Sequence, residues 1–119
     1  MNQNDIIKSY IQSISEDELC SYLKLSASAG YLENLKIIFE IDFIKQNLQQ
    51  FANDILVEAS IMGHLEVIKF AIENGADIHY DNDIALYFNV NTDRIDVIEY
   101  ILSQNPNINL NNSNGVFSL

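Results

Sequence analysis

The sequence predicts an all-α fold: a solenoid of about three helical hairpins preceded by an N-terminal capping helix. One stretch, residues 63–72, recurs 33 positions earlier at 30–39 and 30 positions later at 93–102. In all three copies the apolar residues stand three and four positions apart, which is the spacing of one face of an α-helix. Repeats of this length are typical of solenoids, in which each unit packs only on its neighbours. We therefore expect a single domain over residues 1–119.

The capping helix is expected at about residues 4–14. This segment carries an apolar stripe at helical spacing, formed by Ile6, Ile7, Tyr10, Ile11 and Ile14. A solenoid needs its first core face covered, and a helix of this kind would cover it. Immediately afterwards, Ser15 and Glu18 match a capping box, in which the two side chains satisfy backbone N–H groups at a helix start. The first helix of the first hairpin should therefore begin near Ser15.

The segment before each repeated stretch is repeated as well, and it predicts the first helix of each hairpin. Small residues dominate one part of this segment, which lets two helices approach closely. The corresponding pairs are Tyr22-Leu23 with Ser26-Ala27, Ile55-Leu56 with Ala59-Ser60, and Ala85-Leu86 with Asn89-Val90. Gly30 and Gly63 follow, where a left-handed helix end requires a residue without a Cβ. We expect Ala59 at a tight contact between the helices of its hairpin.

Turn residues mark the ends of the second and third units. Residues 74–79, which begin Asn-Gly, align with residues 104–109, which include Asn-Pro, and both pairs are turn formers. The first unit lacks such a loop, so residues 41–50, apolar and poor in turn formers, are expected to prolong its second helix. The expected units are 15–51, 52–80 and 81–110, followed by a truncated C-terminal segment at 111–119.

Composition narrows the classes of partner. The chain has 17 acidic and 6 basic residues, a formal charge of -11. Such a charge repels phosphate backbones and anionic lipids, so we expect neither nucleic acid nor membrane as a partner. A basic partner protein would be attracted by the same charge. The single cysteine, Cys20, and the absence of a leader-like N-terminal pattern favour a reducing cytoplasm.

The chain offers little catalytic chemistry, and we expect it not to be an enzyme. His64 and His79 lie 15 residues apart and Cys20 has no activating basic cluster, so neither a metal site nor a catalytic thiol is indicated. No cofactor motif is present in the sequence. The acidic groups Glu16 to Glu18 and Asp81 with Asp83 stand at expected helix starts, where carboxylates meet the positive end of the helix dipole.

The middle repeat carries a family resemblance. The string Gly63-His64-Leu65-Glu66-Val67-Ile68-Lys69-Phe70 and the following Glu73-Asn74-Gly75-Ala76-Asp77-Ile78-His79 resemble the second half of an ankyrin repeat. Ala85-Leu86 stands where that family has a Thr-Pro-Leu-His turn. A histidine after the hairpin glycine is structural in the family, so the resemblance implies that His64 orders its turn. The run 81–86 and the spacing of 30 look like the variant found in giant DNA viruses of amoebae and in some protists. The likeness covers about residues 17–109, with Asp93 and Asn89 departing from the family's Gly and Ala.

The resemblance implies an ankyrin-type arc of stacked hairpins, whose first helices and loop tips form a concave surface for a partner protein. On it we place seven partner-binding residues: His79, Tyr80, Asn82, Tyr87, Asn91, Ile61 and Met62. If the source is viral, the partner would be a host protein in the host cytoplasm. Two other functions remain open. The chain would be a scaffold or self-associating segment of a longer repeat protein, or an acidic mimic of nucleic acid.

Overall fold

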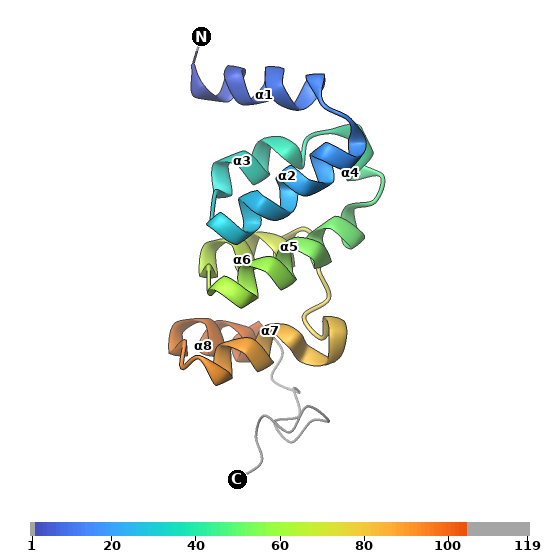
Figure 1. The fold of residues 1–119 in the computed structure, drawn as a ribbon. Coiled ribbons are helices and arrows are strands. Elements are labelled where there is room, and N and C mark those ends of the chain that lie inside the picture. Colours follow the sequence, from blue (N-terminus) through green and yellow to red (C-terminus); the bar gives the residue numbers. More distant parts are fainter. Residues whose placement is uncertain (1, 105–119) are drawn as a thin grey trace.

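The structure, a computed structural model, describes residues 2–104 and consists of stacked helical hairpins (Figure 1). Among these residues every regular element is a helix, and the molecule is elongated, with principal extents of 53, 24 and 20 Å. The helices are α1 (Gln3–Ser13), α2 (Glu16–Ala29), α3 (Leu32–Ile38), α4 (Asp42–Lys45), α5 (Leu48–Met62), α6 (Leu65–Glu73), α7 (Tyr80–Asn91) and α8 (Ile95–Gln104). The expected all-α solenoid is confirmed.

Three hairpins follow one another down the long axis of the molecule: α2 with α3, α5 with α6, and α7 with α8 (Figure 1). The first helix of the middle hairpin, α5, packs against both α2 and α7. Helix α1 lies at the N-terminal end of the stack and packs on α3. No helix among residues 2–104 combines the length and the apolar character that crossing a membrane requires.

The turns within the hairpins are built by residues in the left-handed conformation. Gly30 ends α2 with φ 79° and Gly63 ends α5 with φ 76°, as the sequence predicts. In the third hairpin Asp93 takes the same conformation, with φ 57°. Aspartate tolerates this region better than most residues because its short polar side chain can bond locally. The hairpin geometry is therefore kept although the glycine is missing.

The core lies between the helices of successive hairpins. Ala59, in α5, has no exposed surface, and Ala27 and Ala85 in the neighbouring first helices are equally buried. The expected burial of Ala59 is confirmed. Further along the stack, Phe39 and Phe70 meet edge to face, with ring centroids 5.1 Å apart. Aromatic pairs in this geometry add to the stability that burial provides.

Only part of the apolar stripe expected on the capping helix α1 packs against the stack. Ile11 is buried, whereas Ile6 and Tyr10 are 55% and 48% exposed. Tyr10 instead packs edge-on against Tyr22 of α2, with ring centroids 5.3 Å apart. The next helix start agrees with the sequence, because Ser15 and Glu18 form the predicted capping box.

The expectation that residues 41–50 prolong the second helix of the first unit is wrong. Helix α3 ends at Ile38, and Ile41 is extended, with ψ 134°. The short helix α4 follows, and its Ile44 has no exposed surface. Full burial of such a side chain contributes roughly 1.5–3 kcal/mol, which favours breaking the helix so that Ile44 reaches the core. Helix α5 then begins at Leu48, before the expected unit boundary at residue 52.

Candidate functional site

The seven residues expected to bind a partner lie on the first helices, in two groups joined by one residue. One group, here called the turn group, stands at the hairpin end and comprises Ile61, Met62 and Asn91. The other, the loop group, stands at the opposite end of α7 and comprises His79, Tyr80 and Asn82. Tyr87 lies between them. The regular part of α7, residues 84–91, is about 12 Å long at 1.5 Å per residue, so the two groups do not touch.

In the turn group, apolar side chains project from a fixed backbone. Ile61 and Met62 are the last residues of α5 and are 38% and 51% exposed. The guanidinium of Arg94 donates to the carbonyl oxygens of Ser60 and Ile61, at 3.0 Å each. Because these hydrogen bonds hold the end of α5, the backbone that carries Ile61 and Met62 is fixed in position.

The loop group is built on a left-handed turn. Asp81, Asn82 and Asp83 have φ values of 53°, 57° and 61°, a region that Asn and Asp adopt more readily than other residues. Asp81 and Asp83 stand in the first turn of α7, as expected, but the backbone there is left-handed and not regular helix. Oδ1 of Asp83 lies 2.6 Å from Nδ1 of His79. Tyr80, at the start of the turn, is 38% exposed.

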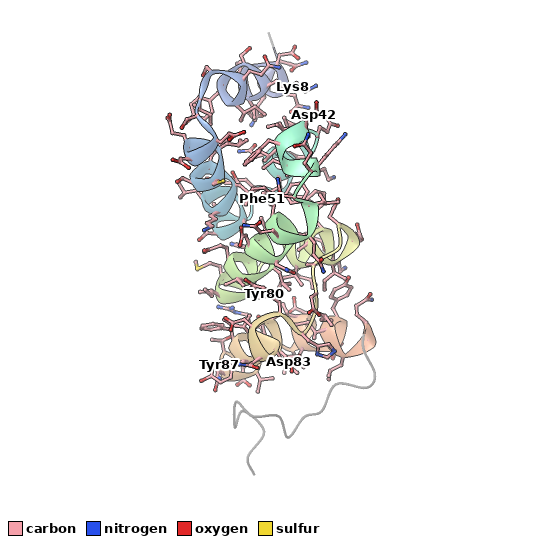
Figure 2. The ribbon with its side chains drawn as sticks, turned by 90° about the vertical axis from the view of Figure 1, so that its right-hand side faces the viewer. Lys8, Asp42, Phe51, Tyr80, Asp83 and Tyr87 are labelled. Atoms are coloured by element: carbon pink, nitrogen blue, oxygen red, sulfur yellow. The ribbon has the colours of Figure 1, made fainter. Side chains whose placement is uncertain are left out.

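A hydrogen-bond chain ties the loop group to the middle hairpin. The backbone N–H of Asp77 donates to Oδ1 of Asn53 in α5 at 2.8 Å. Oδ1 of Asp77 in turn accepts the N–H of His79 at 2.9 Å. In Figure 2, Tyr80 lies on the side of α7 nearer to α5, and Asp83 and Tyr87 lie further toward the C-terminal end of the stack. These hydrogen bonds fix the position of the loop before α7 relative to α5.

Tyr87 connects the loop group to a shallow hollow on α7. Its ring is 36% exposed and packs edge-on against Phe88, with centroids 5.8 Å apart. The hollow has a volume of about 280 Å³ and is lined by Asp81, Asn82, Ile84, Tyr87 and Phe88. Acidic, amide and aromatic groups therefore share one concave patch.

Sequence reasoning missed an equivalent hollow on α2. Leu25 is 67% exposed, the highest value among the large apolar residues described. It lines a hollow of about 320 Å³ together with Tyr10, Asp17, Glu18, Ser21 and Tyr22. The repeat offsets of 33 and 30 place Leu25 in the same column as Phe88. Two large apolar residues at one repeat position of the first helices are the signal from which the hollow on α2 could have been predicted.

The histidines and the cysteine have structural surroundings. His64 was expected to order the turn at Gly63, and its backbone N–H donates to the carbonyl oxygen of Ala59 across that turn. Its Nε2 also lies 2.9 Å from the carbonyl oxygen of Ser28, so the side chain reaches the end of the preceding first helix. Burial and the nearby Asp17 raise the pKa of the Cys20 thiol, which lowers its thiolate fraction. Within residues 2–104, no group of three His, Cys, Asp or Glu side chains is placed to hold a metal ion.

Comparison with known proteins gives a family. A family model described as ankyrin repeats (3 copies) matches residues 23–112, which is most of the chain. Searches of curated proteins and of solved structures gave no match. The matched range begins within α2, includes the rest of the three hairpins and leaves out α1.

Proposed function

We propose that this chain, which belongs to the ankyrin-repeat family, binds a partner protein through the exposed side of its first helices and its loop tips. Ankyrin repeats generally mediate protein–protein interaction. The observation that carries the proposal is the presentation of apolar side chains at fixed positions on these helices. Ile61, Met62, Tyr80 and Tyr87 are each more than a third exposed. Side chains of this kind are frequent anchors at interfaces.

The rigidity of the surface supports the same function. Binding costs free energy when side chains and loops must be ordered, about 0.5–1.5 kcal/mol for each immobilised side chain. Here the end of α5 is held by Arg94 and the loop before α7 by Asn53. The backbone that carries Ile61 and Tyr80 is therefore ordered before a partner arrives, which reduces that cost.

The function is tested with a partner captured by cross-linking from cells of the source organism and then purified. Tyr80→Ala and Met62→Ser each remove an exposed apolar group of the proposed surface. Glu73→Ala, an exposed position on α6, serves as the control. We expect each surface variant to weaken binding by about 2 kcal/mol, roughly 30-fold, with the control within about 0.5 kcal/mol. Loss of binding in the control alone would contradict the proposal.

A second candidate, stacking in a longer array or on another copy, is favoured by one observation. Ile98 of α8 is half-buried, whereas Ile68, its counterpart one unit earlier, has no exposed surface. Light scattering of the isolated chain over a wide concentration range separates the two functions. A mass that stays monomeric favours recognition of a different protein. The third function, mimicry of nucleic acid by the acidic surface, requires binding that is lost at high salt.

The source organism and the cellular compartment of the partner are proposed from the sequence alone. The likeness of the repeat spacing and of residues 81–86 to the giant-virus and protist variant favours such a source. The partner would then be a protein of the host cytoplasm. Residues 111–119, proposed as the start of a further unit, lie outside the residues that the structure describes, as does the end of the third unit at 105–110.

A further inference from the structure

Taken together, the three first helices carry more net negative charge than the three second helices. The first helices α2, α5 and α7 carry one basic residue, Lys24, and seven acidic ones: Glu16, Asp17, Glu18, Asp54, Glu58, Asp81 and Asp83. On the second helices, Lys36 pairs with Glu33 at 3.3 Å and Lys69 with Glu66 at 3.6 Å. The second helices α3, α6 and α8 carry five acidic residues and these two lysines, a net charge of −3, against −6 for the first helices.

The two hollows described above occupy equivalent places on the face that the first helices present. Glu18 and Asp81 fall in one column of the repeat, Ser21 and Ile84 in a second, and Leu25 and Phe88 in a third. Each hollow therefore combines a carboxylate with an exposed or half-exposed apolar side chain. In the middle hairpin the second and third columns hold Asp54 and Glu58. Acidic residues thus lie between two hollows of similar composition.

The hollow on α2 has the groups that receive a basic side chain. Two tyrosine rings, Tyr10 and Tyr22, lie beside the carboxylates of Asp17 and Glu18. The hydroxyl of Tyr22 accepts a hydrogen bond from Asn34 at 2.9 Å, which fixes that ring. Lysine and arginine place their charge near carboxylates and aromatic faces while their stems cover apolar surface. Leu25 supplies apolar surface in this hollow.

We propose, building on the function given above, that the face of α2, α5 and α7 binds an extended basic segment of the partner protein. The charge of this face selects lysine and arginine, and the hollows beside Leu25 and Phe88 receive the stems or the apolar neighbours of those residues. Packed helices lie 8–10 Å apart, so the two hollows, two hairpins apart, are separated by about 20 Å. An extended chain spans this distance in about six residues.

The probe is a synthetic ten-residue peptide with two leucines six residues apart and lysines between them, labelled for fluorescence anisotropy. A second peptide, with glutamates replacing the lysines, reports apolar binding alone. The double variant Asp17→Asn/Glu58→Gln removes two charges from the first helices. Its control, Glu73→Gln/Glu99→Gln, removes two charges from α6 and α8 and has the same net charge.

We expect the lysine peptide to bind the natural chain and the glutamate peptide not to bind. The first-helix double variant should lose on the order of tenfold in affinity and the control less than about twofold, because contacts on the binding face act at close range. Equal losses in the two variants would mean that only net charge matters, and would overturn the proposal. Absence of binding by the lysine peptide would overturn it as well.

The hollow itself is tested by a matched pair of apolar substitutions. Leu25→Ser removes the exposed leucine of the α2 hollow, and Ile6→Ser removes a similarly exposed residue of α1 that lies outside it. Leu25→Ser should weaken the binding of the lysine peptide several-fold, and Ile6→Ser should leave that binding unchanged. A natural partner that depends on Tyr80 and Met62, yet is not displaced by the lysine peptide, would overturn this inference while leaving the proposed function intact.

Discussion

His64 and Arg94 stand at the same place in successive hairpins, and each reaches back to the end of the preceding first helix. Nε2 of His64 lies 2.9 Å from the carbonyl oxygen of Ser28 in α2, and Nη1 of Arg94 lies 3.0 Å from that of Ser60 in α5. The last carbonyl groups of a helix have no partner within the helix and carry its negative dipole end. One repeat position thus links each hairpin to the one before it.

Removing the side chain of Arg94 should destabilise the fold. Arg94→Ala deletes the hydrogen bonds to Ser60 and Ile61 and should lower the free energy of unfolding by about 2 kcal/mol, since bonds to charged groups contribute about 1.5–3 kcal/mol. Urea denaturation measures this. Lys36→Ala, which removes only an exposed ion pair, should cost less than about 1 kcal/mol. Equal costs for the two variants would contradict the assigned role of Arg94.

Glycine at position 63 is required for two reasons, which a pair of variants can separate. A Cβ at Gly63 would lie 2.4 Å from Cδ of Arg94, and the residue has φ 76°. Gly75 also has positive φ, 99°, but a Cβ there meets no atom within 4 Å. Gly75→Ala should therefore cost only the backbone strain, about 1–2 kcal/mol, and Gly63→Ala more. In an Arg94→Ala background the excess cost at Gly63 should disappear; an unchanged excess would refute the clash.

The packing around Ala59, expected at the contact between the two helices of its hairpin, can be tested by substitution. Ala59 has no exposed surface, so Ala59→Leu forces extra methylene groups into a filled contact and should cost about 1–3 kcal/mol of unfolding free energy. Ala29, at the exposed end of α2, should accept the same change with a cost within about 0.5 kcal/mol. Thermal melts followed by circular dichroism compare the two variants. A melting temperature unchanged by Ala59→Leu would show that the contact is not tight.

Asp54 predicts a pH dependence with a definite sign. Burial raises the pKa of its carboxyl above 3.8, and the nearby Lys24 opposes this in part. A carboxyl with a raised pKa binds its proton more tightly in the folded chain, so its contribution to stability falls as pH rises through that pKa. Asp54→Asn should therefore stabilise the chain at pH 7, with the gain shrinking as pH falls toward 4. Urea titrations at several pH values measure this. A variant that is less stable than the natural chain at pH 7 would contradict a raised pKa at Asp54.

The repeat register was predictable because the same physical requirement recurs in each unit. A left-handed residue must end each first helix, and small residues must face the neighbouring helix, so Gly30, Gly63 and Ala59 fall where the sequence places them. The capping box at Ser15 was predictable for the same reason, since it depends on residues three positions apart. Local patterns repeated three times specify the hairpins and their order.

Breaks in the repeat were not predictable from local pattern. The chain turns at Ile41 because Ile44 gains burial against the stack, a tertiary effect that helical periodicity does not contain. Residues 81–83 were expected to start a helix with favourable acidic residues, yet they form a left-handed turn in which Asp83 contacts His79. Single-residue propensity does not distinguish these two outcomes, because aspartate favours both.

The exposure of the candidate residues could be predicted one by one, but the shape of the surface that they form could not. Ile61, Met62 and Tyr80 are exposed as expected, whereas their division into a turn group and a loop group follows from the length of α7. The hollow beside Leu25 depends on Tyr10 of α1, which the stripe of that helix had assigned to the core. Contacts between elements that lie outside the repeat therefore decide where the surface is concave.

Binding of the partner by the first helices and loop tips is tested by hydrogen–deuterium exchange of the chain alone and in complex with its captured partner. We expect added protection at residues 78–84 and over the exposed parts of α2, α5 and α7, with little change in α3, α6 and α8. Protection confined to α3, α6 and α8 would contradict it, because the partner would then occupy the opposite side of the hairpins.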